Sequence, residues 1–261
     1  MAVARMGQGE NRIADACIRT FRRMLPLAYR KRLSMLRARL RRGVAWRIAG
    51  YAHYSVQRIR FRAVASPFKI LYIDPRQVRA QLRNEDQYRT KWFWGTIKDG
   101  DWDRAINYRY GEDDFAYRSM CQHFHDGVPW EDTPLFAYYA KLLTCQPSTK
   151  GCRSLSELGR YYRSEIDSLH EDVRKNGIRW PSDPELEPIY VYIGRHGELI
   201  YSAGGNHRLH ISKVLGIREF PVLVRMRHLH WQMVREAAKS GTLSQDSLVE
   251  YRGHPDLQDL L

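Results

Sequence analysis

The sequence lacks several features that would place it in a class at once. No stretch approaches the roughly 18 consecutive apolar residues of a membrane-spanning helix, so we expect no such helix. The N-terminus has no compact apolar run followed by small residues, as a secretory signal would, which predicts a cytoplasmic protein. An aromatic content of 12% argues against a wholly disordered chain, and 261 residues suffice for one domain with a terminal extension.

Cysteine is scarce, with four residues and no Cys-x-x-Cys pair. Free thiols are therefore expected rather than a framework of disulfides. The alternation of Cys121, His123 and His125 would suit a zinc site on a strand. The surrounding segment has the pattern of a helix, however, and on a helix these three side chains diverge. We therefore predict no zinc site at these three residues.

Acidic residues are almost absent from the first quarter of the chain. Residues 1–62 hold 16 Lys and Arg and two acidic residues, a net charge of +14 that equals the charge of the whole chain. Apolar residues recur there at helical spacing, which predicts basic amphipathic helices over 10–24 and 28–49. Such a segment can lie on an anionic membrane surface, dock on its own domain, or follow a nucleic-acid backbone. Few aromatic residues lie among the arginines, so nucleic acid is the least favoured partner.

The remaining chain predicts an α/β (α+β) domain over residues 67–240, with a helical insertion at 91–150. A basic helical extension, 1–66, precedes it, and a short helical tail, 241–261, follows it. In the extension, residues 50–66 are expected to be a connecting segment. The other expected elements are a strand at 68–73, an ordered tryptophan-rich loop at 91–110, and helices at 113–125, 131–143 and 154–176.

A glycine turn lies in the middle of the next group of elements. Two short strands, at 189–193 and 198–201, lead into Gly204-Gly205-Asn206-His207-Arg208, a helix at 209–215, and a strand at 220–224. A glycine turn that feeds a helix start exposes backbone N–H groups towards one point, which favours a phosphate. The His207 imidazole and the Arg208 guanidinium would strengthen such a site. A short motif of this kind also suits a tight turn in which both side chains pair with nearby carboxylates.

The order of these elements, from a helix that ends in glycine to the Phe-Pro-Val strand, resembles the ParB/sulfiredoxin superfamily. The resembling block is Glu165–Val224, to which the strand at 70–75 adds a first element. The resemblance implies a ParB/sulfiredoxin-like core whose turn binds nucleotide phosphates. The residues implied as the phosphate grip are Gly204, Gly205, Asn206, His207 and Arg208.

Departures from the patterns of individual members narrow the expected function. Sulfiredoxins carry a catalytic cysteine where this chain has Asn206. Chromosome-partition proteins, which hydrolyse CTP, continue into a long helix-turn-helix region, whereas 53 residues follow Arg208 here. The superfamily also includes a free-serine kinase. The resemblance therefore leaves a phosphotransferase or nucleotide hydrolase that uses ATP or CTP with Mg²⁺, or a non-catalytic nucleotide- or DNA-binding regulator.

Phosphoryl transfer also needs a carboxylate that orients the acceptor. One pair of candidates, Glu165 and Asp167, lies on a predicted helix, where a spacing of two lets at most one reach the site. The pattern of each favours a solvated helix charge over a catalytic group. Asp101 and Asp103 flank Trp102, whose ring could stack on a sugar; alternatively Trp102 anchors the loop on the core while both aspartates face water. The whole chain also resembles prokaryotic proteins encoded beside cell-surface glycan enzymes. We therefore expect the acceptor to be a hydroxyl of a small molecule or a glycan precursor near the membrane.

Overall fold

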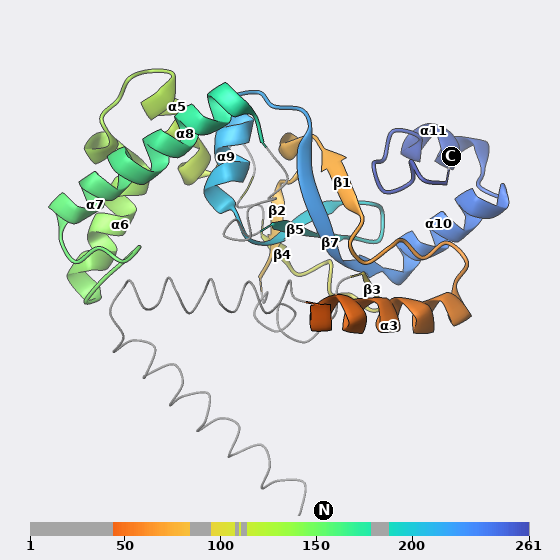
Figure 1. Cartoon of the computed structure of the whole chain (residues 1–261). Helices are drawn as coiled ribbons and strands as arrows, with labels where there is room; N and C mark the ends of the chain where they lie inside the picture. Colours follow the sequence, from red (N-terminus) through yellow and green to blue (C-terminus); the bar gives the residue numbers. More distant parts are fainter. Residues whose placement is uncertain (1–43, 84–94, 108–109, 111–113, 179–187, 261) are drawn as a thin grey trace, which may run out of the picture.

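A computed structural model describes residues 44–83, 95–107, 110, 114–178 and 188–260. These residues form an α/β fold in which helices surround a mixed sheet (Figure 1). The predicted helix at 10–24 and most of the one at 28–49 lie outside the described residues. None of the described helices is both long enough and apolar enough to cross a bilayer.

The sheet has seven strands in the order β1-β7-β5-β6-β2-β4, and β3 also pairs with β7. The strands β5, β6 and β7 are buried along their whole length, as expected for the centre of a sheet that is covered on both faces. β1 and β3 pair with successive halves of the long strand β7. The strands are β1 (Ile70–Ile73), β2 (Ala80–Leu82), β3 (Thr96–Lys98), β4 (Ile106–Asn107), β5 (Ile189–Ile193), β6 (Leu199–Ala203) and β7 (Phe220–His228).

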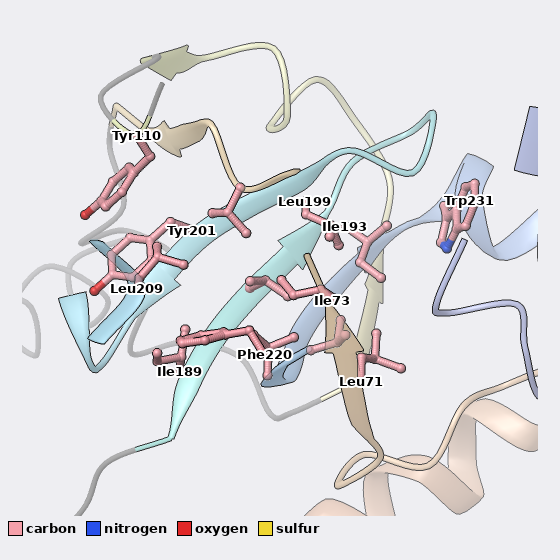
Figure 2. Close-up of a cluster of buried hydrophobic side chains, with 14 of the residues drawn as sticks. Leu71, Ile73, Tyr110, Ile189, Ile193, Leu199, Tyr201, Leu209, Phe220 and Trp231 are labelled. Carbon is pink, nitrogen blue, oxygen red and sulfur yellow. The ribbon is translucent and has the colours of Figure 1, made fainter. Parts of the chain in front are cut away.

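Alternation along β5 divides the core between the two faces of the sheet. Ile189 and Ile193 pack on the face that carries Leu209 of α9 (Asn206–Val214) and Trp231 of α10 (Leu229–Ser240), as Figure 2 shows. Tyr190 of the same strand points to the opposite face. The predicted strand–glycine turn–helix–strand order thus occurs as one continuous unit around the centre of the sheet.

A helical layer covers the outer side of α9 (Figure 1). Its first helices start at the side-chain caps Asp114 and Thr133, and Ser154 caps the next one by accepting from the Glu157 N–H, as predicted. A single π-helical stretch interrupts the last helix before it stops at Gly177. The elements are α5 (Phe115–Phe124), η2 (Trp130–Asp132), α6 (Pro134–Cys145), α7 (Leu155–Tyr161), η3 (Tyr162–Ile166) and α8 (Asp167–Asn176).

Two segments differ from the sequence-based expectation. Much of the expected connecting segment 50–66 is helical, because α3 (Val44–Arg60) continues well past residue 49. The tryptophan-rich loop at 91–110 contributes β3 and β4 to the sheet. These two strands are too short to show an alternating pattern, and their pairing partners, β7 and β2, come from other parts of the chain.

The C-terminal tail belongs to the core. After α11 (Gln245–Tyr251), the chain folds back and buries Asp256 and Leu257 completely. Asp256 accepts hydrogen bonds from Arg227 on β7 and Trp231 on α10. The short helical tail predicted at 241–261 is therefore bound to the sheet through a buried ion pair.

Candidate phosphate-binding site

The start of α9 is a glycine turn in left-handed conformation. Gly204 has φ 80° and Gly205, which caps the helix, has φ 56° and ψ 32°. A Cβ atom on Gly205 would lie 2.6 Å from Cγ1 of Ile189 and 2.7 Å from Nη2 of Arg208. Glycine is therefore needed at residue 205 both for the backbone angle and for the space. The Arg208 guanidinium folds back against the turn.

No side chain caps α9. The first backbone bond of the helix runs from the Leu209 N–H to the Gly205 carbonyl, at 3.0 Å. The N–H groups that precede Leu209 lie in the first turn, where an α-helix has no acceptor of its own for them. This end of the helix also carries the positive end of the helix dipole, which favours an anion.

A small polar cavity of about 130 Å³ lies beside this helix start. Asn206, His207 and His210 line it from α9, while Asp114 at the start of α5 and Tyr139 of α6 line it from the helical layer. Two helix N-termini therefore meet at the cavity. Pockets for drug-sized ligands usually measure roughly 300 Å³ or more, so this cavity can take a phosphate group but not a whole nucleotide.

Asp114 and His210 form a buried pair in the cavity wall. The Asp114 Oδ2 lies 2.7 Å from Nε2 of His210, and Nδ1 of the same ring lies 2.9 Å from the Asn206 carbonyl oxygen. The other carboxylate oxygen accepts from the Ala116 N–H at 2.9 Å. Because the Asn206 carbonyl is an acceptor, the His210 ring donates to it from Nδ1 and faces Asp114 with Nε2. The carboxylate is therefore engaged by His210 and by the start of α5.

His207 is largely buried at the same cavity. Burial lowers the pKa of its imidazole to about 3, and the nearby charges of Lys150 and His210 add to this shift. At neutral pH the ring is therefore neutral, with one N–H donor and one acceptor nitrogen. A neutral donor beside a helix start can bind a phosphate oxygen without requiring a proton from solution.

The lowered pKa of His207 predicts a pH-dependent stability. Between the unfolded value of 6.5 and the folded value of about 3, the unfolded chain binds a proton that the folded chain does not, so stability falls as pH falls through this window. Replacing His207 with leucine should remove this contribution. Below about pH 6.5 the free energy of unfolding of the wild type should fall, relative to that of the variant, by up to about 1.4 kcal/mol per pH unit. Urea unfolding of both proteins at several pH values measures this; a constant difference would contradict it.

Lys150 is a cation near the site that sequence reasoning missed. It lies in a tight two-residue turn, closed by paired backbone bonds between Thr149 and Cys152, and has φ 48°. No other non-glycine residue of the described chain has a positive φ. Its Nζ lies 4.9 Å from the ring centre of Tyr139, which lines the cavity. Strained backbone of this kind often occurs at functional sites, but residue type alone does not reveal it.

Glu165, a predicted catalytic carboxylate, lies in the helical layer. It is exposed on the π-helical stretch η3 and lies near Tyr161. Burial raises the pKa of Tyr161 to about 12, and the charge of Glu165 contributes to this shift. The Tyr161 ring centre is 6.4 Å from that of His207. Asp167, two residues further on, instead accepts from Nε1 of Trp130 at 2.8 Å.

Asp101 and Asp103 do not reach the glycine turn. Both bind Arg195 in the turn between β5 and β6, with Nη2–Oδ1 distances of 2.7 Å. Gly204 follows the far end of β6, and strands of this length span roughly 16 Å. The expectation that these two aspartates serve the phosphate site therefore fails on geometry.

Trp102 cannot act as an open stacking platform for a sugar. Its side chain is buried against Tyr192, and its Nε1 donates to the Lys98 carbonyl at 3.2 Å. Asp103 is also buried, whereas Asp101 is exposed. The ring thus anchors the loop on the core, as the alternative interpretation held, but only Asp101 of the two aspartates faces water.

The residues considered for zinc binding lie on α5 and the residue after it, and they have other surroundings. His123 stacks on Trp130, and its Nδ1 lies 2.7 Å from the Val128 carbonyl oxygen. Cys121 is a free thiol that packs against the helical core. Within the described ranges, no group of three or more His, Cys, Asp or Glu side chains is arranged to hold a metal ion.

In comparisons with known proteins, no family model, no curated protein and no solved structure matches this chain.

Proposed function

We propose that this protein binds the phosphate groups of ATP or CTP at the start of α9. The observation that carries the proposal is the uncapped helix start led by Gly204 and Gly205, with the Arg208 guanidinium against it and a phosphate-sized cavity beside it. The resemblance of residues 165–224 to the ParB/sulfiredoxin superfamily, whose turn binds nucleotide phosphates, supports the same assignment.

The charges around the cavity favour an anion. Asp114 is engaged by His210, and His207 supplies a neutral donor. Two cations lie outside the lining of the cavity, Arg208 against Gly205 and Lys150 beside Tyr139, and they add to the two helix N-termini that meet there. A terminal phosphate would enter the cavity, while the nucleoside would lie outside it.

The favoured use of the bound nucleotide is phosphoryl transfer to a hydroxyl group of a small molecule or a cell-surface glycan precursor. Mg²⁺ fits such a site because it is usually held by substrate phosphates with one or two carboxylates, and when bound it would neutralise charge on the phosphates. Glu165 is the exposed carboxylate in the neighbourhood and would orient the acceptor. The basic segment 1–62 would bring the protein to an anionic membrane on its cytoplasmic side.

A non-catalytic nucleotide- or DNA-binding regulator is the second candidate. It is favoured by the engagement of Asp101 and Asp103 with Arg195, which leaves Glu165 as the sole predicted carboxylate near the turn. Product analysis with ATP, CTP and hydroxyl acceptors distinguishes the two. If the protein turns over the nucleotide and Glu165→Gln reduces the rate, phosphoryl transfer is supported. If it binds nucleotide without turnover, or binds DNA in a salt-sensitive way, the regulatory function is supported.

The substitution Lys150→Gly separates binding from folding. Glycine adopts the left-handed backbone without strain, so the variant should be at least as stable as the wild type. Loss of a charge-assisted contact of about 1.5 kcal/mol should weaken binding of the nucleotide roughly tenfold. Thermal melts over a range of ATP and CTP concentrations, with Mg²⁺, measure both effects.

Lys175→Ala is the matched control, because this lysine side chain is 65% exposed on α8, outside the residues that line the cavity. It should leave the nucleotide-induced shift of the melting temperature unchanged. Equal shifts for the wild type and Lys150→Gly would remove Lys150 from the site.

A further inference from the structure

Helix α3 carries an apolar stripe that the described structure leaves exposed. Ile48 is 63%, Val56 63% and Ile59 88% exposed, although large apolar side chains in a helix usually face a core. Spacings of eight and eleven residues place the three on one side of the helix, together with Ala52. The stripe therefore runs along the outer face of α3.

The opposite face of α3 is fixed to the sheet. The Gln57 side chain donates to the Gly95 carbonyl at 3.2 Å and accepts from the Ile97 N–H at 3.1 Å. His53 lies 3.2 Å from the Thr96 hydroxyl, next to β3 and the end of β7. These contacts hold α3 along the outside of the described structure, as Figure 1 shows. The exposed fractions of Ile48, Val56 and Ile59 place the stripe on the side of α3 that faces away from the sheet.

Arginines flank the stripe, and α3 contains no acidic residue. Three of them lie beside aromatic rings at the margin of the helix, at 5.4 to 6.0 Å from the ring centres. In this position their charges lie beside the isoleucines and do not cover them. The three arginines are Arg47, Arg58 and Arg60.

We infer that the outer face of α3 docks on an anionic lipid bilayer, with Ile48, Val56 and Ile59 at the boundary between headgroups and acyl chains. This inference rests on the membrane role proposed for residues 1–62 and is independent of nucleotide binding at α9. A central apolar stripe with cations on its margins is the arrangement of helices that lie in a membrane interface. The flanking arginines would then reach the lipid phosphates, each contributing to binding.

Charge and shape favour this partner over two others. A nucleic-acid backbone would reward the arginines but would gain nothing from isoleucines at the centre of the face. A second copy of the chain would bring the same arginine margins against each other, because a twofold interface pairs identical patches.

Sedimentation of the full chain with vesicles tests the inference. Vesicles of phosphatidylcholine mixed with phosphatidylglycerol should bind the protein. The partition coefficient of the double variant Ile48→Ser/Ile59→Ser should be lower by a factor of roughly ten or more. The matched control is Val249→Ser, which removes a side chain that is 80% exposed on α11. It should partition like the wild type.

The charge dependence supplies a second readout. Arg58→Gln/Arg60→Gln should weaken binding to the mixed vesicles, and pure phosphatidylcholine should bind the wild type poorly. Circular dichroism checks that each variant is folded. Partitioning of Ile48→Ser/Ile59→Ser equal to the wild type would overturn the inference. Binding of duplex DNA in place of vesicles would also overturn it. A wild-type dimer that dissociates in the variant Ile48→Ser/Ile59→Ser would do the same.

Discussion

Replacing Asp256 with alanine is expected to lower the free energy of unfolding by about 3–5 kcal/mol and to release the C-terminal tail. The carboxylate is fully buried and accepts from Arg227 at 2.6 and 2.8 Å and from Trp231 at 3.0 Å. Arg235, also buried, lies 3.4 Å away. Alanine would leave Arg227 buried without its carboxylate partner, while Arg235 would keep Asp259, and an unpaired buried charge is among the most destabilising of all defects.

The protonation of Asp256 has the same consequence at low pH. Burial alone would raise the pKa of this carboxyl, but Arg227 and Arg235 hold it far below its usual value of 3.8. The stabilisation is therefore present above pH 3.8 and is lost as pH falls below it. Urea unfolding, together with limited proteolysis of the tail, measures the effect of Asp256→Ala.

Asp259→Ala is the matched control for the tail. Its side chain is 36% exposed and pairs with Lys69 at 2.8 Å and with Arg235 at 3.1 Å. A pair of this exposure contributes about 1 kcal/mol or less. If Asp256→Ala and Asp259→Ala lower the free energy of unfolding by similar small amounts, the tail does not depend on the buried carboxylate.

The substitution Gly205→Ala should remove the phosphate site and lower stability. A left-handed backbone costs alanine about 1–2 kcal/mol, and forcing a methyl group into contact with Ile189 costs about 1–3 kcal/mol more. Relief of this contact would shift the helix start or displace the Arg208 guanidinium. The variant should therefore unfold at a lower urea concentration and show no melting shift with ATP or CTP.

Gly216→Ala separates the steric effect from the backbone effect. Gly216 follows the other end of α9 with φ 66°, and a Cβ there would meet nothing within 4 Å. Gly216→Ala should therefore lower the free energy of unfolding only by the strain of the left-handed backbone, about 1–2 kcal/mol, and should leave nucleotide binding intact. If both variants bind nucleotide equally, the tight turn at Gly205 is not part of the site.

Local patterns predicted the centre of the fold well. The runs of β-branched and aromatic residues in β5 and β7 specify strands, and the glycines that flank α9 specify its limits. Each of these signals lies within about a dozen residues of the element that it predicts. The short strands β3 and β4 were missed because their pairing partners lie elsewhere in the chain.

The environment of the acidic side chains could not be read from sequence. Asp103 is held by Arg195, which lies 92 residues away, and Asp256 by Arg227, which lies 29 residues away. In a sequence, such residues look like ordinary solvated acids. Lys150 was missed for a different reason: the backbone strain that distinguishes it depends on the turn and not on the residue type.

The most direct measurement is calorimetric titration of ATP and CTP, with Mg²⁺, into the full chain. If the start of α9 binds phosphate groups, at least one nucleotide should bind saturably at one site, and inorganic triphosphate should compete with it. Weaker binding at higher salt should accompany this. Absence of binding by both nucleotides and by triphosphate at millimolar concentration would contradict phosphate binding at this turn.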